Sequence, residues 1–316
     1  MNTKKHCSFL FLSVMLLFFL CPSLCFSGAK SGITLWINTV IPSLLPFLLL
    51  ANIVLEAGLL PYLTELIYPL LGPLFGVSKN GCFPILIGAI SGFPVGAKTC
   101  ADLVKQGQIS LQEGQYLLSF VNNASPMFLI VYMASQCLQC KTLQYPLYFI
   151  ILLSSLICSI VSRIFFISKQ PSFSQRTSKF LQNTKENKTH IATILDHSII
   201  NSFLTVTKIG GYVILLSIVS TFLSHLPKQI QYTRYILLAA TEMTTAIHQI
   251  SISDLTLHTK IILSLASATS GGISSLLQTQ SVIAESGLSM KLYIVAKIFQ
   301  TTVVLLCTYG FLIILR

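Results

Sequence analysis

Glu242 is the acidic residue whose position says most about the chemistry of this chain. It lies in the otherwise apolar stretch of residues 235–250. Hydroxyl side chains flank it at Thr241, Thr244 and Thr245. A carboxylate at the centre of a bilayer costs roughly 2.5–3.5 kcal/mol on insertion scales, so such a residue needs a function or a partner. Two hypotheses follow: a substrate or proton site, which we favour, or a carboxylate paired with Lys98, His248 or another helix.

A second group of candidate residues lies at 91–96, in the sequence Ser-Gly-Phe-Pro-Val-Gly. Gly92 and Gly96 permit close backbone approach or a positive φ, and Pro94 lacks the N–H that would continue a helix. A hairpin tip here would leave backbone N–H groups at the start of a half-helix, where the helix dipole favours anions. The sequence therefore predicts an anion-binding tip, with Ser91 as a further polar group.

Amides and a hydroxyl interrupt a third apolar segment, residues 115–134. Asn122, Asn123 and Ser125 lie at its middle, followed by Pro126, which would free a backbone carbonyl. We expect these donors and acceptors to face the tip at 91–96. The alternative is that the amides hold helices together and the glycines serve tight packing. Lys98, directly after the tip, is either a counter-charge for an anion or a lysine that reaches toward the interface.

The other residue patterns that could support chemistry are weaker evidence for a functional site. Cys137 and Cys140 form a C-x-x-C pair, but no second pair or histidine cluster accompanies it, and His248 and His258 are interpreted as loop or interfacial residues. The sequence contains no H-E-x-x-H motif and no phosphate-binding glycine loop. We therefore expect no metal, no cofactor and no enzymatic activity.

Composition identifies the environment in which these residues must work. Of the 316 residues, 53% are apolar and only 9% are charged, where a soluble domain averages about 25%. The mean hydropathy is +0.77. These values exclude an ordinary soluble enzyme and a disordered chain. The net charge of +11 comes from residues in short loops, as positive-inside sorting predicts, which excludes nucleic-acid binding. The partner is the lipid bilayer.

The predicted elements divide the chain at a long hydrophilic stretch. Four units are expected: an N-terminal, signal-like helix that we expect to be retained (1–32), a first repeat (33–167), a basic cytoplasmic linker (168–197) and a second repeat (198–316). Long apolar spans are expected at 7–26, 36–55, 143–167, 198–226 and 292–315. Segments broken by Gly, Pro or polar residues are expected at 82–97, 115–134, 235–250 and 261–283. The stretch 59–77 contains three prolines and is expected to be interfacial or bent.

The second half repeats the pattern of the first. An offset of 146 residues aligns 109–111 and 117–126 with 255–257 and 263–272, and an offset of 150 aligns 91–94 with 241–244. With Lys4, Lys5 and the linker on the inside, the crossings place the two halves in opposite orientations. The predicted fold is an all-α polytopic integral membrane protein with two inverted repeats, made of seven or eight helices and two re-entrant hairpins or broken helices.

Three motifs carry a resemblance to a known family. They are Trp36-x-x-x-Val-Ile-Pro-Ser-Leu-Leu-Pro-Phe47, Ser91-Gly-Phe-Pro-Val-Gly-Ala-Lys98 and Asn122-Asn-Ala-Ser-Pro126. They resemble the nucleoside-recognition (Gate) domain membrane proteins and, within them, the YlbJ-type sporulation integral membrane proteins. The likeness covers roughly residues 33 to 310. This chain departs from the family pattern at Ala246 and at Gly271-Gly272. Both positions lie in the part of the chain that resembles the family's second gate repeat.

The resemblance implies a protein of the mother-cell-derived membrane around the forespore, and passage of dipicolinate, a small aromatic dicarboxylate. Our hypothesis is carrier-type transport of a small anion. The predicted substrate-binding residues are Ser91, Gly92, Pro94, Gly96, Lys98, Asn122, Asn123, Ser125, Thr241, Glu242, Thr244, Ser270 and Gly271. A non-transporting scaffold for spore maturation and a nucleoside transporter stay open as alternatives. So do a homo-oligomer and partners among sporulation membrane proteins.

Overall fold

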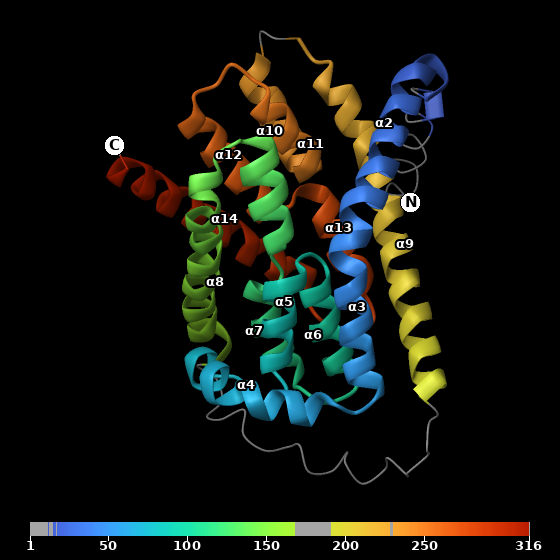
Figure 1. The fold of residues 1–316 in the computed structure, drawn as a ribbon, viewed down its shortest axis with the longest axis vertical. Coiled ribbons are helices and arrows are strands. Elements are labelled where there is room, and N and C mark those ends of the chain that lie inside the picture. Colours follow the sequence, from blue (N-terminus) through green and yellow to red (C-terminus); the bar gives the residue numbers. More distant parts are fainter. Residues whose placement is uncertain (1–11, 13–14, 17, 168–190, 228–229, 316) are drawn as a thin grey trace, which may run out of the picture.

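The chain is an all-α polytopic membrane protein, as predicted. The computed structural model describes residues 12, 15–16, 18–167, 191–227 and 230–315, and this part of the chain contains helices and no strand (Figure 1). Five helical segments in it are long and apolar enough to cross a membrane, by length and composition: Pro22–Glu56, Lys141–Phe165, Ile191–Ser224, Leu257–Ile283 and Met290–Ile314.

The described elements follow one another along the chain, with residues 168–190, between Ile167 and Ile191, outside the described part. In order they are α2 (Pro22–Leu35), η1 (Trp36–Val40), α3 (Ile41–Glu56), α4 (Leu60–Phe75), α5 (Cys82–Ser91), α6 (Val95–Lys105), α7 (Leu111–Val121), η2 (Met127–Cys137), η3 (Lys141–Leu143), α8 (Gln144–Ile167), α9 (Ile191–Ser224), α10 (Gln231–Thr241), α11 (Met243–Ser251), α12 (Leu257–Ser270), α13 (Gly272–Ile283) and α14 (Met290–Ile314).

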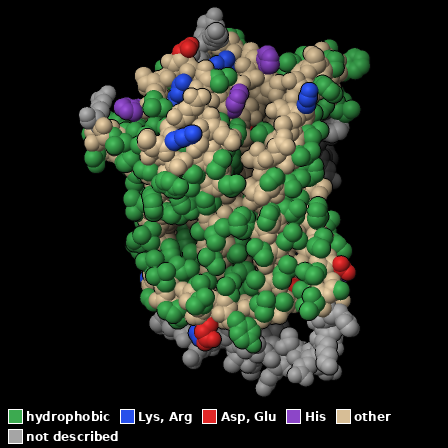
Figure 2. All heavy atoms as spheres, in the orientation of Figure 1, with side chains coloured by type: hydrophobic (Ala, Val, Ile, Leu, Met, Phe, Trp, Pro, Cys, Tyr) green, Lys and Arg blue, Asp and Glu red, His purple; other side chains and the backbone are tan. Residues whose placement is uncertain are grey.

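The bundle presents an apolar surface to its surroundings. Figure 2 shows hydrophobic side chains covering the middle of the visible face, with Lys, Arg and His side chains near its upper end. Large apolar residues from several helices are exposed, among them Leu66, Ile164 and Leu306. A soluble protein rarely exposes so much contiguous apolar area, and lipid is the solvent that accepts it.

The first long segment corrects the predicted division at residue 32. We expected a loop between spans at 7–26 and 36–55, but α2, η1 and α3 form one continuous helical segment of 35 residues. Pro42 and Pro46 lie in α3 just after this join, and η1 is a wider π-helical turn that precedes Pro42. Because a proline ring clashes with the carbonyl four residues earlier, the helix widens here instead of ending. Most of the predicted span 7–26 lies outside the described residues.

The stretch predicted to be interfacial or bent forms a helix that crosses the end of the bundle. α4 lies across the lower end in Figure 1, roughly at right angles to the long helices. It contains Pro69 and Pro73 and ends at Gly76, whose φ of 65° is left-handed. Its outer face carries Tyr62, Leu66 and Leu70, each more than 70% exposed. An apolar outer face beside the bundle end is typical of a helix at the membrane interface.

Each broken segment is divided into two short helices where the sequence predicted an interruption. The breaks lie at Gly92–Pro94 between α5 and α6, at 122–126 between α7 and η2, at Glu242 between α10 and α11, and at Gly271 between α12 and α13. In Figure 1 the α5–α6 pair lies in the lower half of the bundle and the α10–α11 pair in the upper half. That the halves are inverted repeats, and that either pair re-enters the membrane, stay predictions.

Two predicted boundaries are wrong. The stretch 98–114 was expected to be a polar link, but α6 continues to Lys105 because Ala97, Cys100, Ala101 and Leu103 form a fully buried face. The linker was expected to extend from residue 168 to residue 197, but α9 already begins at Ile191. The C-terminal boundary of the linker therefore lies earlier than predicted. Residues 168–190 lie outside the described part of the chain.

A close helix contact joins the two halves of the chain. Gly28 and Gly32 of α2 face α9, and a Cβ atom at Gly32 would lie 2.7 Å from the Cα of Ile214. At Gly28 the corresponding distance to the Cα of Ile218 is also 2.7 Å. Small residues let helix backbones approach each other in membranes, where burial of apolar area contributes little. We name this contact, formed by Gly28 and Gly32 against Ile214 and Ile218, the α2–α9 seam.

The seam predicts that a larger side chain will separate the helices. Gly32→Leu should lower the stability of the purified protein by about 1–3 kcal/mol, the usual cost of overpacking. Gly211→Leu on α9 is the matched control, because Gly211 is exposed and has no atom within 4 Å of its Cβ position. Thermal denaturation in detergent measures both. Equal melting temperatures for the two variants would contradict the seam.

Candidate substrate-binding site

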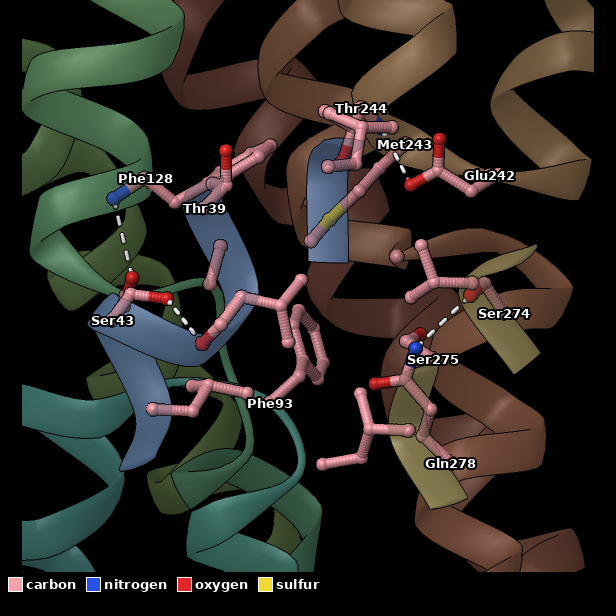
Figure 3. Close-up of a pocket in the computed structure, with 18 of the residues that line it drawn as sticks. Thr39, Ser43, Phe93, Phe128, Glu242, Met243, Thr244, Ser274, Ser275 and Gln278 are labelled. Atoms are coloured by element: carbon pink, nitrogen blue, oxygen red, sulfur yellow. Dashed lines mark hydrogen bonds between the residues drawn. The ribbon is translucent and has the colours of Figure 1, made fainter. Parts of the chain in front are cut away.

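The four breaks surround one cavity inside the bundle. Its lining includes Ser91 and Phe93 from the first break, Ala124 and Ser125 from the second, Glu242 and Thr244 from the third, and Gly271 from the fourth. The remaining lining comes mostly from α2–α3, α9 and α13: Leu35, Thr39, Val40, Ser43, Leu44, Ile209, Val213, Ser274, Ser275 and Gln278, together with Phe128 and Met243. The cavity has a volume of about 60 Å³. Segments far apart in sequence thus line one cavity (Figure 3).

Glu242 is held by its own helix rather than by a lysine or histidine. One carboxylate oxygen accepts a hydrogen bond from the backbone N–H of Thr244 at 2.9 Å, and the other from that of Thr245 at 2.7 Å. The side chain therefore caps the N-terminus of α11 and is 3% exposed. The positive end of the helix dipole favours the carboxylate there. The alternative that it pairs with Lys98 or His248 is not what the structure shows, since neither side chain forms an ion pair with it.

Gly92 and Ser125 hold the first two breaks against each other. Gly92 has a φ of 82°, and a Cβ atom on it would lie 2.5 Å from the backbone N of Ser125. Ser125 in turn accepts a hydrogen bond from the N–H of Phe128 through its side chain, which caps η2. Only a glycine permits both the positive φ and the close approach. Pro94 precedes α6, and Gly96 packs against the carbonyl of Val121.

Ser91 is the lining residue with an unused polar atom. Its side chain is fully buried, and its hydroxyl has no hydrogen-bond partner within the described part of the chain. A buried hydroxyl without a partner costs about 1–3 kcal/mol. Such a group at a cavity wall is suited to a ligand that supplies the missing partner.

The N-terminus of α13 provides the largest polar wall. Gly271, with a φ of 67°, precedes this helix, and no side chain caps it. Ser274, Ser275 and Gln278 of the same helix line the cavity, and the Gln278 amide donates to the Ser274 hydroxyl at 3.0 Å. An uncapped helix N-terminus favours negative charge. Sequence reasoning missed these three residues, although they follow the predicted break at helical spacing.

Eight predicted site residues do not line the cavity. They are Gly92, Pro94, Gly96, Lys98, Asn122, Asn123, Thr241 and Ser270. Lys98 donates to the Asp102 carboxylate at 2.6 Å and to the Asn52 amide at 3.2 Å, so it is engaged on α6 and α3 and is not a free counter-charge. The hydroxyls of Thr241 and Ser270 donate to backbone carbonyls of their own helices.

The two asparagines face away from the cavity, into the packing of α13 and α14. Asn122 donates to the Thr279 hydroxyl at 2.9 Å and to the Tyr293 hydroxyl at 2.8 Å. Asn123 accepts hydrogen bonds from the side chains of Lys297 and Gln300. Their position agrees with the alternative that these amides hold helices together.

A larger hollow, of about 500 Å³, lies beyond one wall of the cavity, between η2, α11 and α12. Its lining includes Tyr132, His248 and Lys260. Tyr132 separates it from the cavity: its hydroxyl donates to the carbonyl of Thr244 at 3.2 Å, and its ring stacks on Phe128 at 5.1 Å between centroids. Neither space contains a cluster of three or more His, Cys, Asp or Glu residues, within the described residues, that could hold a metal ion.

Comparison with known proteins agrees with the resemblance drawn from the motifs. The chain is 26% identical over 309 residues to "Sporulation integral membrane protein YlbJ" of Bacillus subtilis (strain 168), and the alignment covers 88% of this chain and 75% of that protein. The chain is similar to a YlbJ-type sporulation membrane protein. This similarity supports the YlbJ-type assignment and a membrane role in sporulation.

No family model matches the chain. No solved structure matches it either. The Gate-domain part of the resemblance therefore stays a prediction.

The cap at Glu242 predicts a loss of stability when it is removed. Glu242→Ala should destabilise the protein by about 0.5–2 kcal/mol, because the cap is buried and water cannot replace it. Thr256→Ala is the matched control: Thr256 caps α12 through a hydrogen bond to the Thr259 N–H at 3.4 Å, and it is exposed to solvent. We expect the control to melt close to the original protein. A control that loses as much stability as Glu242→Ala would contradict the buried cap.

Proposed function

We propose that this chain is a carrier for a small anionic metabolite in sporulating cells, and that it works without covalent chemistry. One observation carries the proposal: the four helix breaks surround a single cavity. A break in a transmembrane helix leaves backbone N–H and C=O groups unpaired, which is unfavourable in a membrane. Secondary transporters have such breaks at their substrate sites. A scaffold has no need for four breaks in matched positions of the two halves.

Two features of the lining support an anion as the solute. The N-terminus of α13 is uncapped, and Ser91 has a buried hydroxyl without a partner on the same cavity. Helix N-termini and hydroxyl donors are the groups that bind carboxylates. Glu242 also lines the cavity, and the two backbone hydrogen bonds that it accepts from α11 offset part of its negative charge.

The resemblance supports dipicolinate as the first solute to test, and the membrane around the forespore as the place of transport. The similar protein of Bacillus subtilis is, by its name, a sporulation integral membrane protein. A pyridine ring with two carboxylates is larger than a cavity of about 60 Å³, which has room for only a few water molecules. The carrier proposal therefore requires part of the lining to move when the solute enters.

Uptake into proteoliposomes tests the proposal. The full chain, reconstituted from detergent, should accumulate labelled dipicolinate above the level of protein-free liposomes and should not accumulate labelled adenosine. Uptake of adenosine alone would favour the nucleoside alternative and contradict the anion. Absence of both, with correctly folded protein in the vesicles, would contradict transport and favour the scaffold.

A matched pair of substitutions on α13 tests whether the solute binds in the cavity. Gln278→Leu removes a polar group from the lining and should lower dipicolinate uptake roughly tenfold or more, the effect of losing one hydrogen bond to a charged group. Gln280→Leu makes the same change two residues away on the exposed side of the helix and should leave uptake unchanged. Similar uptake by both variants would remove the cavity as the binding site.

A further inference from the structure

Lys297 is a buried lysine in the last membrane-spanning helix, and the sequence interpretation did not single it out. It lies on α14 and is 3% exposed. Its amine donates to the side-chain oxygen of Asn123 at 3.1 Å and to that of Gln300 at 2.8 Å. Two amides, and not a carboxylate, therefore hold the charged end of this side chain.

Within the part of the chain that the structure describes, no acidic side chain pairs with Lys297. No Asp or Glu of the described residues lies within 4 Å of its amine, whereas Lys79, Lys98 and Lys105 each have one. An ammonium group in an apolar environment is expensive unless a partner is present. In its protonated form the Lys297 amine carries three donors, and the hydrogen bonds to Asn123 and Gln300 use two of them. One donor is left for an acceptor that the described part of the chain does not supply.

The surroundings of the amine are built to hold a cation. Gln300 donates to Asn123 at 2.8 Å and to the Ser155 hydroxyl at 2.9 Å, so the two amide oxygens are turned toward Lys297 by a buried network. The amine also lies 4.9 Å from the centre of the Phe93 ring and 5.9 Å from that of Tyr293. Aromatic faces attract cations at these distances, which makes this place tolerable for a charge without a counter-ion.

Phe93 connects this charge to the cavity. Its ring contacts Lys297 and also lines the cavity, where a Cβ atom on Gly271 would lie 3.3 Å from the tip of the ring. Figure 3 shows the ring standing between the Ser43 side of the cavity and the Ser275 side. Phe93 belongs to the non-helical tip between α5 and α6, so its side chain can turn without breaking a hydrogen bond of either helix. The ring is thus a partition between the buried cation and the space that we assign to the solute.

We propose that Lys297 is the cationic group that binds a carboxylate of the solute once Phe93 moves aside. This inference rests on the proposed function and adds the residue that makes the site selective for an anion. The ligand class is a small carboxylate, in which one oxygen accepts the unused donor of Lys297 while the N-terminus of α13 receives the opposite end. The site would then discriminate by charge and not by ring shape alone.

The test compares two solutes of the same shape and three variants of one helix. Proteoliposomes take up labelled dipicolinate, with labelled pyridine-2,6-dicarboxamide as the uncharged counterpart. Lys297→Met should lower dipicolinate uptake roughly tenfold to a hundredfold, because a hydrogen bond to a charged group is lost. Lys297→Arg keeps the charge and should recover part of the uptake. Lys291→Met, an exposed lysine on the same helix, should behave as the original protein.

The outcomes separate this inference from the proposed function. If the original protein takes up neither solute, transport itself fails. If dipicolinate uptake is normal in both Lys297→Met and Lys291→Met, transport stands and the role of Lys297 is refuted. If Lys297→Met does not accumulate in the membrane, the uptake of the two solutes by the original protein and by Lys297→Arg decides the question. Preference for the dicarboxylate, with Lys297→Arg active, supports the inference, whereas equal uptake of the dicarboxamide overturns it.

Discussion

The structure depends on one constraint: a backbone N–H or C=O that lies in an apolar interior must find a partner. A continuous helix meets it without help, and the long outer helices of this bundle do so. Every interruption creates unpaired groups, so interruptions are stable only where other parts of the protein approach them. Four interruptions gathered around one cavity satisfy that condition together. Gly92 against Ser125 and Glu242 on the N-terminus of α11 are two of the contacts that make this gathering possible.

The two buried charges near the cavity are managed in different ways. Glu242 accepts hydrogen bonds from backbone N–H groups of the helix it begins, which stabilise its carboxylate without removing the negative charge. Lys297 donates to two amide oxygens and lies near two aromatic faces, which orient its amine but supply no counter-charge. We assign the attraction of the anionic solute to Lys297 and not to Glu242.

The sequence predicted the breaks well because Gly, Pro and short polar residues in apolar runs act locally. The breaks at Pro94 and Gly271 follow from the backbone preferences of proline and glycine, whereas the break at Glu242 is stabilised by its side chain, which caps α11. The partners of the side chains were harder to predict. Lys98 donates to Asp102 and Asn52, and the contact with Asn52 depends on how α6 packs against α3, which no local sequence pattern contains. Lys297 could have been found, since a lysine on the same helix face as Tyr293 and Gln300 in an apolar span meets the criterion that singled out Glu242. The continuity of α2 and α3 was missed because the packing of Gly28 and Gly32 on α9, which lies far along the chain, is not contained in any local pattern.

The α2–α9 seam has a consequence for how the protein is made. Its two sides are separated by more than 150 residues, so the ribosome delivers α2 long before α9 exists. Until then the glycine face of α2 has no helix to receive it, and lipid or another protein of the insertion machinery must cover it. The first half of the chain therefore cannot reach its final packing until α9 has been synthesised. Packing at the seam waits for α9 to emerge.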